Sequence, residues 1–454
     1  MFRRSLVVAL AVALAPISAS AADLLQVYEM ARSGDTQLSV AESNRLYTKE
    51  GQVQARAALL PNIGGSASFD RTRSEPDGVS GSYTTKTRTV GISGSQTVFN
   101  WSQFANLRAQ RSLSKAADFT LESANDELIV RTAATYFNVL VAIESLSAAQ
   151  TNEAAAKKQF DYADKRLEVG LAPITDVHEA RAQYDQARAD TILARNALED
   201  AYQALTELTG QPVRNLQALP EDFRPELPAN RADVDQLVAR AVATNPALKA
   251  AELQVSAAES SVSAARGGHY PSLSLGASVG ESASWGDGIG GGTRSPNGTS
   301  NSIELKLNVP IFAGGATQSA VRQALAQRDI AQDQYEQARR NLDRTTRNAW
   351  QTLVAGISEV EARRLAVVSA QAAYDASQVG LEVGTRTVLD VVQNQRTLYA
   401  AQLNYAQARY NYLQNRLQLS YALGELDIDE VQDINRLLTQ SAEARLQGPI
   451  TTRN

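Results

Sequence analysis

An internal duplication is the feature that most constrains what this chain can fold into. Residues 169–177 (VGLAPITDV) align with residues 383–391 (VGTRTVLDV) at an offset of 214, and the same offset pairs Gly210 with Gly424. Nearer the start of each half the offset slips slightly, as insertions in loops would produce. The sequence therefore predicts one structural unit used twice.

Both units have the same predicted order of elements. A helical segment of about 35 residues is followed by a two-stranded hairpin, a long proline-free helix, a glycine turn and a return helix. The first unit spans residues 23–210, with its opening helix at 24–58, hairpin at 61–99, long helix at 101–169 and return helix at 173–209. The second spans residues 233–424, with its opening helix at 233–267, hairpin at 271–312, long helix at 315–383 and return helix at 387–423. The tip turns are expected at Gly170 and Gly384.

The two hairpins have the pattern of membrane strands. Apolar residues such as Ile63, Phe69 and Leu305 alternate with small or polar ones. A period of two indicates strands with one apolar face, and each strand is long enough to cross a membrane at a tilt. The polar, glycine-rich connections at 74–82 and 281–302 are predicted as loops.

Three segments lie outside the repeats. Residues 1–22 predict a signal peptide, because two arginines precede an apolar run and a small-residue cleavage site after Ala21 or Ala22. Residues 211–232 are rich in proline and predict a linker at mid-height of the helices. Residues 425–454 are expected to pack against the same level. Export restricts the chain to the periplasm, the outer membrane or the medium.

Composition excludes several classes of function. The chain has no cysteine, two histidines and a formal net charge of −5. Thiolate metal sites and a cysteine nucleophile are excluded, and an acidic chain is a poor candidate for binding nucleic acid. No catalytic triad or metal-ligand spacing stands out, so we expect neither an enzyme nor a cofactor. Beyond the signal peptide no stretch reaches 18 consecutive apolar residues, which argues against a transmembrane helix.

Four membrane strands cannot close a barrel by themselves. A sheet edge exposed to lipid would leave backbone groups unpaired, so copies of the chain must combine. Two copies would give eight strands and a filled interior, whereas three would give twelve strands and an open lumen. The long helices favour three, because they would continue the lumen for on the order of 100 Å. The predicted fold class is mainly α with membrane β: a duplicated chain forming a trimeric 12-stranded β-barrel that continues into a long periplasmic α-helical barrel.

Three kinds of function fit such a molecule. A gated export duct predicts trimers and a channel that is mostly closed. A diffusion porin predicts a constitutively open channel of large conductance. A periplasmic coiled-coil fibre predicts no conductance, and it leaves the paired amphipathic strands unexplained.

Short motifs in order along the mature chain resemble the TolC family of Gram-negative outer-membrane export ducts, the outer membrane factors. They are LLQVY at 24–28, TYFNVL at 135–140, ITDV at 174–177, ARAQYD at 180–185, VGTRT at 383–387 and ARYNYL at 408–413. The resemblance implies a homotrimer in outer-membrane lipid whose tunnel projects into the periplasm. It implies passive export of proteins and small toxic compounds in tripartite efflux and type I secretion systems. The implied partners are a periplasmic adaptor (membrane fusion) protein and an inner-membrane ABC or proton-driven transporter.

The resemblance also implies a closed aperture at the periplasmic helix turns, held by polar contacts and lined by acidic residues. The positions that match the gate lock are Thr175 and Asp176 on one return helix and Arg386 at the head of the other. Arg386 is expected to bond Thr175 or Asp176, on the same or a neighbouring chain. Asp390 matches the acidic ring in the lumen, where three like charges are expected to raise one another's pKa.

Two positions depart from the family pattern. Leu381 stands where the family has a tyrosine, and Gln393, one turn after Asp390, stands where it has a second acidic residue. The gate is therefore expected to have fewer locking bonds and one acidic ring instead of two.

Two further features have simpler interpretations. Residues 286–291 (GDGIGG) satisfy the glycine pattern of nucleotide-binding loops, but no helix follows, so a polar loop is expected. His178 lies near the lock residues, where a pH-sensing role is conceivable; a solvated histidine on a helix surface is the preferred interpretation.

Overall fold

A computed structural model describes residues 22–75, 82–171, 173–226, 233–287 and 297–446 of the 454-residue chain. The chain divides into two compact units. We call them the helical unit (Met1–Ala41, Glu122–Pro246 and Arg340–Asn454) and the sheet unit (Glu42–Leu121 and Ala247–Arg339). The long helices α4 (Trp101–Glu168) and α8 (Ala316–Glu382) each contribute residues to both units.

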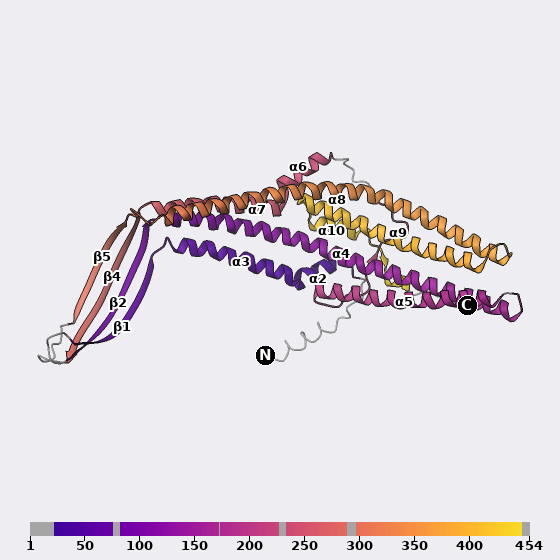
Figure 1. The fold of residues 1–454 in the computed structure, drawn as a ribbon, viewed down its shortest axis with the longest axis horizontal. Helices are drawn as coiled ribbons and strands as arrows, with labels where there is room; N and C mark the ends of the chain where they lie inside the picture. The colour runs from indigo at the N-terminus through magenta and orange to yellow at the C-terminus, as the bar shows by residue number, and fades with distance from the viewer. Residues whose placement is uncertain (1–21, 76–81, 172, 227–232, 288–296, 447–454) are drawn as a thin grey trace, which may run out of the picture. The chain divides into compact units, whose positions relative to one another are not determined.

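The sheet unit contains a single four-stranded antiparallel sheet (Figure 1). Its strands are β1 (Asn62–Ser74), β2 (Tyr83–Phe99), β4 (Ser272–Asp287) and β5 (Gly298–Asn308), in the spatial order β1-β2-β4-β5. Each repeat supplies one hairpin, and the hairpins join where β2 pairs with β4, with Gly91 opposite Gly280. In the single chain, β1 and β5 are therefore the edges of the sheet.

The two faces of this sheet differ in chemistry. The strand register places Ile63, Ile92, Val279 and Ile303 on one face, one from each strand. The alternate positions are mostly serine, threonine and glycine. A sheet with one apolar and one polar face is what a membrane barrel needs between lipid and lumen.

The strands of the second hairpin are longer than predicted. Residues 281–287 and 298–302, expected in a loop, form the ends of β4 and β5. Runs of serine and glycine are locally typical of a loop. However, β4 pairs with β2 as far as Thr84 opposite Asp287, and this pairing provides hydrogen-bond partners for the backbone groups of the added residues. Of the glycine-rich motif at 286–291, Gly286 and Asp287 lie in β4, and the rest lies outside the described residues.

The opening helix of each repeat also differs from the prediction, because it is broken in two. The structure has α2 (Leu24–Gly34) followed by α3 (Thr36–Ala57), and α6 (Val234–Thr244) followed by α7 (Pro246–Arg266). Asp35 accepts the backbone N–H of Leu38 at 3.0 Å and so starts a new helix. In the second repeat Pro246, which has no N–H to donate, begins α7 directly after Asn245.

The second break lies against the end of a return helix. The return helices are α5 (Ile174–Thr209) and α9 (Val388–Leu423). The side chain of Asn245 donates to the carbonyl of Ala422 at 3.3 Å, and the hydroxyl of Thr244 donates to that of Leu423 at 2.5 Å. These carbonyls have no partner inside α9, so the break supplies the hydrogen bonds that the helix end requires.

A buried ion network lies in the helical unit. Arg409 on α9 is 3% exposed and donates to both carboxylate oxygens of Glu144 on α4 at 2.7 Å. Arg445, in the C-terminal segment, donates to the same carboxylate at 2.7 Å. The two guanidinium groups also donate to the linker carbonyls of Pro220 and Leu219. One carboxylate therefore connects two helices, the linker and the C-terminal segment.

The segments outside the repeats pair with one another. The linker strand β3 (Gln217–Ala218) is antiparallel to β6 (Gln440–Ser441), between α10 (Ile428–Asn435) and the turn η2 (Glu443–Leu446). Ala22, placed in the predicted signal peptide, forms a bridge with Leu216. Residues 1–21, 227–232 and 447–454 of these predicted segments lie outside the described residues.

Among the described helices, α4 is long and apolar enough by composition to pass as a membrane span. Half of the apolar window that qualifies is buried in the protein. Leu128, Tyr136, Leu140 and Ile143 of α4 are all fully buried core residues. The apolar character of α4 thus comes from core packing.

Replacing Glu144 by glutamine should destabilise the protein by about 3 kcal/mol, because two buried guanidinium groups would lose their counter-charge. The matched control is Glu199→Gln, which removes the exposed ion pair with Arg214 and should leave the unfolding midpoint close to that of the wild type. Thermal unfolding in detergent measures both. Equal unfolding midpoints for the two variants would contradict the assigned role of the network.

Candidate functional site

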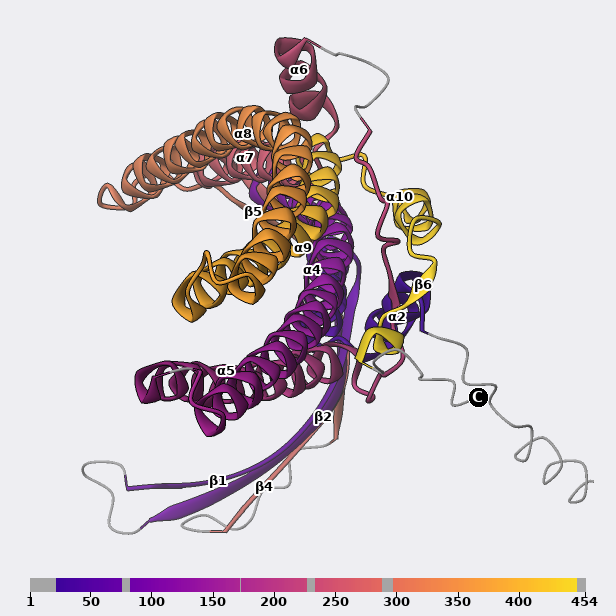
Figure 2. The ribbon, with the colours of Figure 1, turned by 90° about the vertical axis from the view of Figure 1, so that its right-hand side faces the viewer.

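The predicted site residues lie at the turns of two helical hairpins, α4–α5 and α8–α9 (Figure 2). Gly170 and Gly384 have φ angles of 74° and 78°, the left-handed region that glycine enters without strain. The N–H of Leu171 donates to the carbonyl of Arg166 at 2.8 Å, and that of Thr385 to Gly380 at 2.8 Å. Both helices thus end in the same glycine-terminated motif, which turns the chain toward its return helix.

A small hydrophobic cluster, here called the tip core, holds the two hairpins together within one chain. Its buried members come from all four helices and are Ala163, Val177, Ala180, Leu381, Val388, Val391 and Val392, with Phe160, Leu167 and Tyr374 packed against them. Leu381, where the family pattern has tyrosine, is 7% exposed in this cluster. The departure therefore exchanges a hydrogen-bonding side chain for an apolar contact between hairpins.

Arg386 lies in the turn just before α9. Its guanidinium is 3.9 Å from the carboxylate of Asp390 one turn later, and its side chain is 62% exposed. Its aliphatic stem lies against Gly380, where an added Cβ would be 2.5 Å from the Arg386 Cγ. Gly380 was missed by sequence reasoning. The sequence signal is a glycine inside the last turn of a helix. Glycine destabilises a helix there, so its presence indicates that another group needs the space of a side chain.

Asp390 is held by a capping box at the start of α9. Its carboxylate accepts the backbone N–H and the hydroxyl of Thr387, each at 2.9 Å. These bonds, with a smaller contribution from Arg386, hold the pKa of Asp390 below its usual range. Thr387 was also missed, although the pattern T-x-x-D before an apolar run indicates such a cap.

The other return helix starts differently. Pro173 precedes α5 without any side-chain cap, and Asp176 lies half-buried in the first turn. Thr175 and His178 are exposed on the same helix. The two turns are thus alike in backbone and unlike in polar chemistry.

The expected lock is not formed within one chain. In the described part of the chain, Arg386 makes no hydrogen bond or ion pair with Thr175 or Asp176 and instead lies near Asp390 in the first turn of α9. A contact between neighbouring chains remains a prediction. Gln393 is exposed one turn beyond Asp390.

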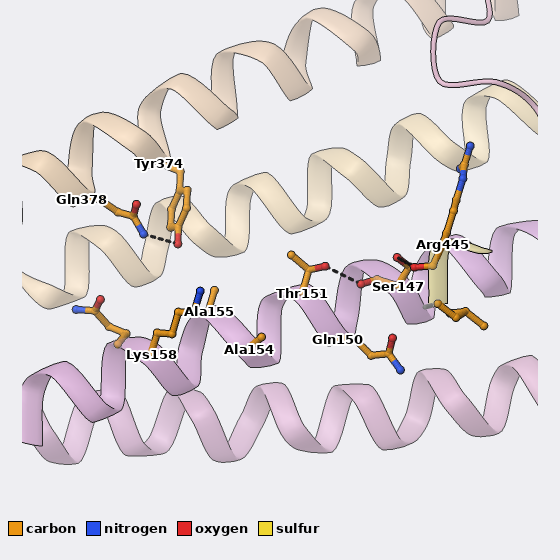
Figure 3. Close-up of a pocket in the computed structure, with 11 residues that line it drawn as sticks. Ser147, Gln150, Thr151, Ala154, Ala155, Lys158, Tyr374, Gln378 and Arg445 are labelled. Carbon is orange, nitrogen blue, oxygen red and sulfur yellow. Dashed lines mark hydrogen bonds between the residues drawn. The ribbon is translucent and has the colours of Figure 1, made fainter. Parts of the chain in front are cut away.

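A groove between α4 and α8 lies further along the hairpins (Figure 3). It has a volume of about 560 Å³ and is lined by Ser147, Thr151 and Lys158 of α4 and by Tyr374 and Gln378 of α8. Ala154 and Ala155 leave it open along α4. Within the described ranges, no group of His, Cys, Asp and Glu side chains is arranged to hold a metal ion. The groove offers contact surface and no reactive cluster.

Comparison with known proteins places the chain among outer-membrane channels. The model of the family described as outer membrane efflux protein matches twice, at residues 27–211 and 237–425. The outer membrane protein TolC of Escherichia coli (strain K12) is 35% identical over 431 residues, covering 92% of this chain and 86% of TolC. The alkaline protease secretion protein AprF of Pseudomonas aeruginosa is 28% identical over 427 residues, covering 90% of this chain and 86% of AprF. The crystal structure of CusC superposes with a TM-score of 0.76 at 20% identity, covering 88% of this chain and 92% of CusC.

Replacing Leu381 by alanine should loosen the tip core, since burying a leucine there contributes about 2 kcal/mol or more. Trypsin should then cut after Arg386 about tenfold faster or more, because cleavage requires local opening. Leu171→Ala is the control: Leu171 lies at the other turn and is 67% exposed. If the two variants are cut at the same rate, the tip core does not hold the turns.

Proposed function

This chain belongs to the outer membrane efflux protein family, and from that membership we propose that three copies assemble into a gated exit duct. The chain is an outer-membrane protein with a periplasmic helical tunnel, and it serves efflux and secretion. The fold class predicted from the sequence is confirmed. The family consists of channel proteins, not enzymes.

The unpaired edges of the sheet are the observation that supports assembly into a trimer. β1 and β5 are sheet edges in the single chain, and an edge in lipid is forbidden. Joining β1 of one copy to β5 of the next closes a ring, and three copies give twelve strands around an open lumen. The serine-rich and threonine-rich face of the sheet would line that lumen.

The duct works with an inner-membrane transporter, and the finer assignments belong to this proposal. The transporter, of ABC or proton-driven type, supplies the energy, and a periplasmic adaptor joins it to the duct. The groove between α4 and α8 supports adaptor docking, because its alanines leave room for the side chains of another helix. AprF is named for secretion of an alkaline protease, which supports protein export beside that of small toxic compounds.

The gate is proposed to be closed by two kinds of contact. Inside each chain, the tip core fixes the α8–α9 turn against the α4–α5 turn. Between chains, the exposed guanidinium of Arg386 reaches Thr175 or Asp176 of a neighbour. Asp390 of each copy, with Gln393 beside it, faces the narrowest part of the tunnel. Opening then requires the interchain bonds to break while each hairpin pair stays intact.

Arg386→Ser should raise single-channel conductance in planar bilayers, because three interchain bonds would be lost from the closed state. The control is Arg363→Ser, which removes an exposed ion pair with Glu359 on α8, away from the turns, and should leave conductance unchanged. Unchanged conductance in Arg386→Ser would place the gate elsewhere. A wild-type channel that is already fully open would favour the porin.

Asp390→Asn should abolish the cation preference of the channel and its block by trivalent cations, since a ring of carboxylates focuses negative potential. The control is Asp375→Asn on α8. Capping lowers the pKa of Asp390 and so shifts the loss of cation preference toward lower pH.

Repulsion within the ring acts in the opposite direction and raises the pKa, so Thr387→Ala separates the two effects. Without the cap, the pH at which selectivity disappears should rise. Gln393→Asp should strengthen trivalent block by adding a second ring. Selectivity that is unaffected by Asp390→Asn would mean that this carboxylate does not line the pore.

A further inference from the structure

Three exposed arginines lie on the helices next to the sheet, at the periplasmic side of the membrane strands. They are Arg56 in the last turn of α3 and Arg108 and Arg111 near the start of α4, and we call them the basic patch. α3 leads into β1 and α4 follows β2, so all three are close to the strands along the chain (Figure 1). They belong to the sheet unit together with the strands.

An aromatic contact shows which face of α4 carries the two arginines. Phe99, the last residue of β2, is opposite Leu273 and therefore lies on the apolar face of the sheet, which a membrane barrel turns toward lipid. Phe104 on α4 packs on Phe99 with ring centroids 6.5 Å apart. Arg108 and Arg111 follow Phe104 by four and seven residues, so they share its face of the helix. This face of α4 continues the lipid-facing side of the sheet.

Arg56 lies on the same side as the other two arginines. Arg45 and Lys49 of α3 both pair with Asp118 of α4, at 2.5 and 2.9 Å. Asp118 follows Arg111 by seven residues, and Arg56 follows Lys49 by seven. Seven residues are two turns of a helix and return a side chain to the same face. α3 and α4 therefore present one common outward face, with the basic patch at its end next to the membrane.

The basic patch has no acidic partner. Within the described residues none of its three arginines forms an ion pair, whereas the two cations farther from the membrane share Asp118. Two other acidic side chains on these helices, Glu50 of α3 and Glu259 of α7, are exposed and equally unpaired. Arg266 at the end of α7 adds a further cation. The helix ends next to the membrane thus carry an excess of positive charge.

Aromatic side chains place the level of the lipid headgroups beside the patch. Trp101, the first residue of α4, meets Tyr270 edge to face with ring centroids 6.0 Å apart. Tryptophan and tyrosine favour the interface between hydrocarbon and water. The guanidinium of Arg108 lies 5.3 Å from the centre of the Trp101 ring and donates to the hydroxyl of Ser263 at 3.5 Å. These contacts hold a cation at the interface without neutralising it.

We propose that the basic patch binds the phosphate groups of anionic phospholipids in the periplasmic leaflet of the outer membrane. The patch continues the lipid-facing side of the sheet and lies next to the interfacial aromatic pair, so a lipid headgroup reaches it while the acyl chains cover the sheet. Side chains of a helix lean toward its N-terminus, which in α4 is the membrane end. Guanidinium groups suit phosphate, because their donors match two of its oxygens. The contact would fix the depth of the barrel in the membrane.

The test uses the mature chain purified as its assembly in detergent and titrated with phosphatidylglycerol, with bound lipid counted by native mass spectrometry. Arg111→Gln should weaken binding about fivefold, and Arg108→Gln combined with Arg111→Gln about 25-fold, since each cation near an anionic surface contributes roughly that factor.

The matched control is Lys115→Gln. Lys115 is exposed, has no ion pair within the described residues and lies on the same face two turns beyond Arg108. It is about 10 Å farther from the membrane along the helix, where screening leaves little attraction, so binding should change less than about twofold.

Equal phosphatidylglycerol binding by the double variant and the wild type would overturn the proposal. So would wild-type binding of zwitterionic phosphatidylcholine that is as tight, or displacement of the lipid by inorganic phosphate at equal concentration. If the double variant fails to assemble, Arg111→Gln compared with Lys115→Gln decides. A double variant that binds the lipid normally but no longer sediments with purified peptidoglycan would identify the cell wall as the partner and refute binding to lipid.

Discussion

An unpaired backbone group in hydrocarbon costs several kcal/mol, and the described part of this chain brings four strands to the membrane. Most of the architecture follows from that constraint. The two hairpins of the duplicated chain pair through β2 and β4, which leaves β1 and β5 to be satisfied by other copies. Because one chain cannot close a barrel alone, several copies must close it together, and the closed ring then encloses a lumen.

The duplicated units have diverged at the two turns where we propose that the gate lies. Both turns use the same glycine-terminated backbone, at Gly170 and Gly384. Only the second has the capping box of Thr387 and Asp390 and an arginine seated against Gly380. The two turns have the same backbone but different polar groups. One turn can therefore present hydrogen-bond donors and the other acceptors, as the proposed contacts between neighbouring copies require.

Buried and exposed charged side chains play different roles in this molecule. Glu144 lies among Arg409 and Arg445 and fixes the linker and the C-terminal segment to the helices. Arg386 is exposed, and on the sheet so is Arg73 in its ion pair with Glu75. A buried pair is costly to break and therefore structural, whereas exposed charges stay available to a partner or a permeating ion.

The sequence by itself determined the duplication, the long helices and the alternating strands. Apolar residues recur with a period of 2 in the strands and of about 3.6 in the helices, and these local patterns are recognised without knowledge of any distant contact. It also contained Asp35, Asn245-Pro246 and the T-x-x-D cap, which indicate helix breaks and ends. Tertiary structure alone decided that β2 pairs with β4, that the serine-rich residues 281–287 form strand, and that Leu381 joins a core shared by four helices. It also decided that Arg386 lies near Asp390 of the following helix within one chain. These features depend on which distant segments meet in the fold. A local sequence pattern does not say which segment pairs with a strand edge or which group lies next to a charge.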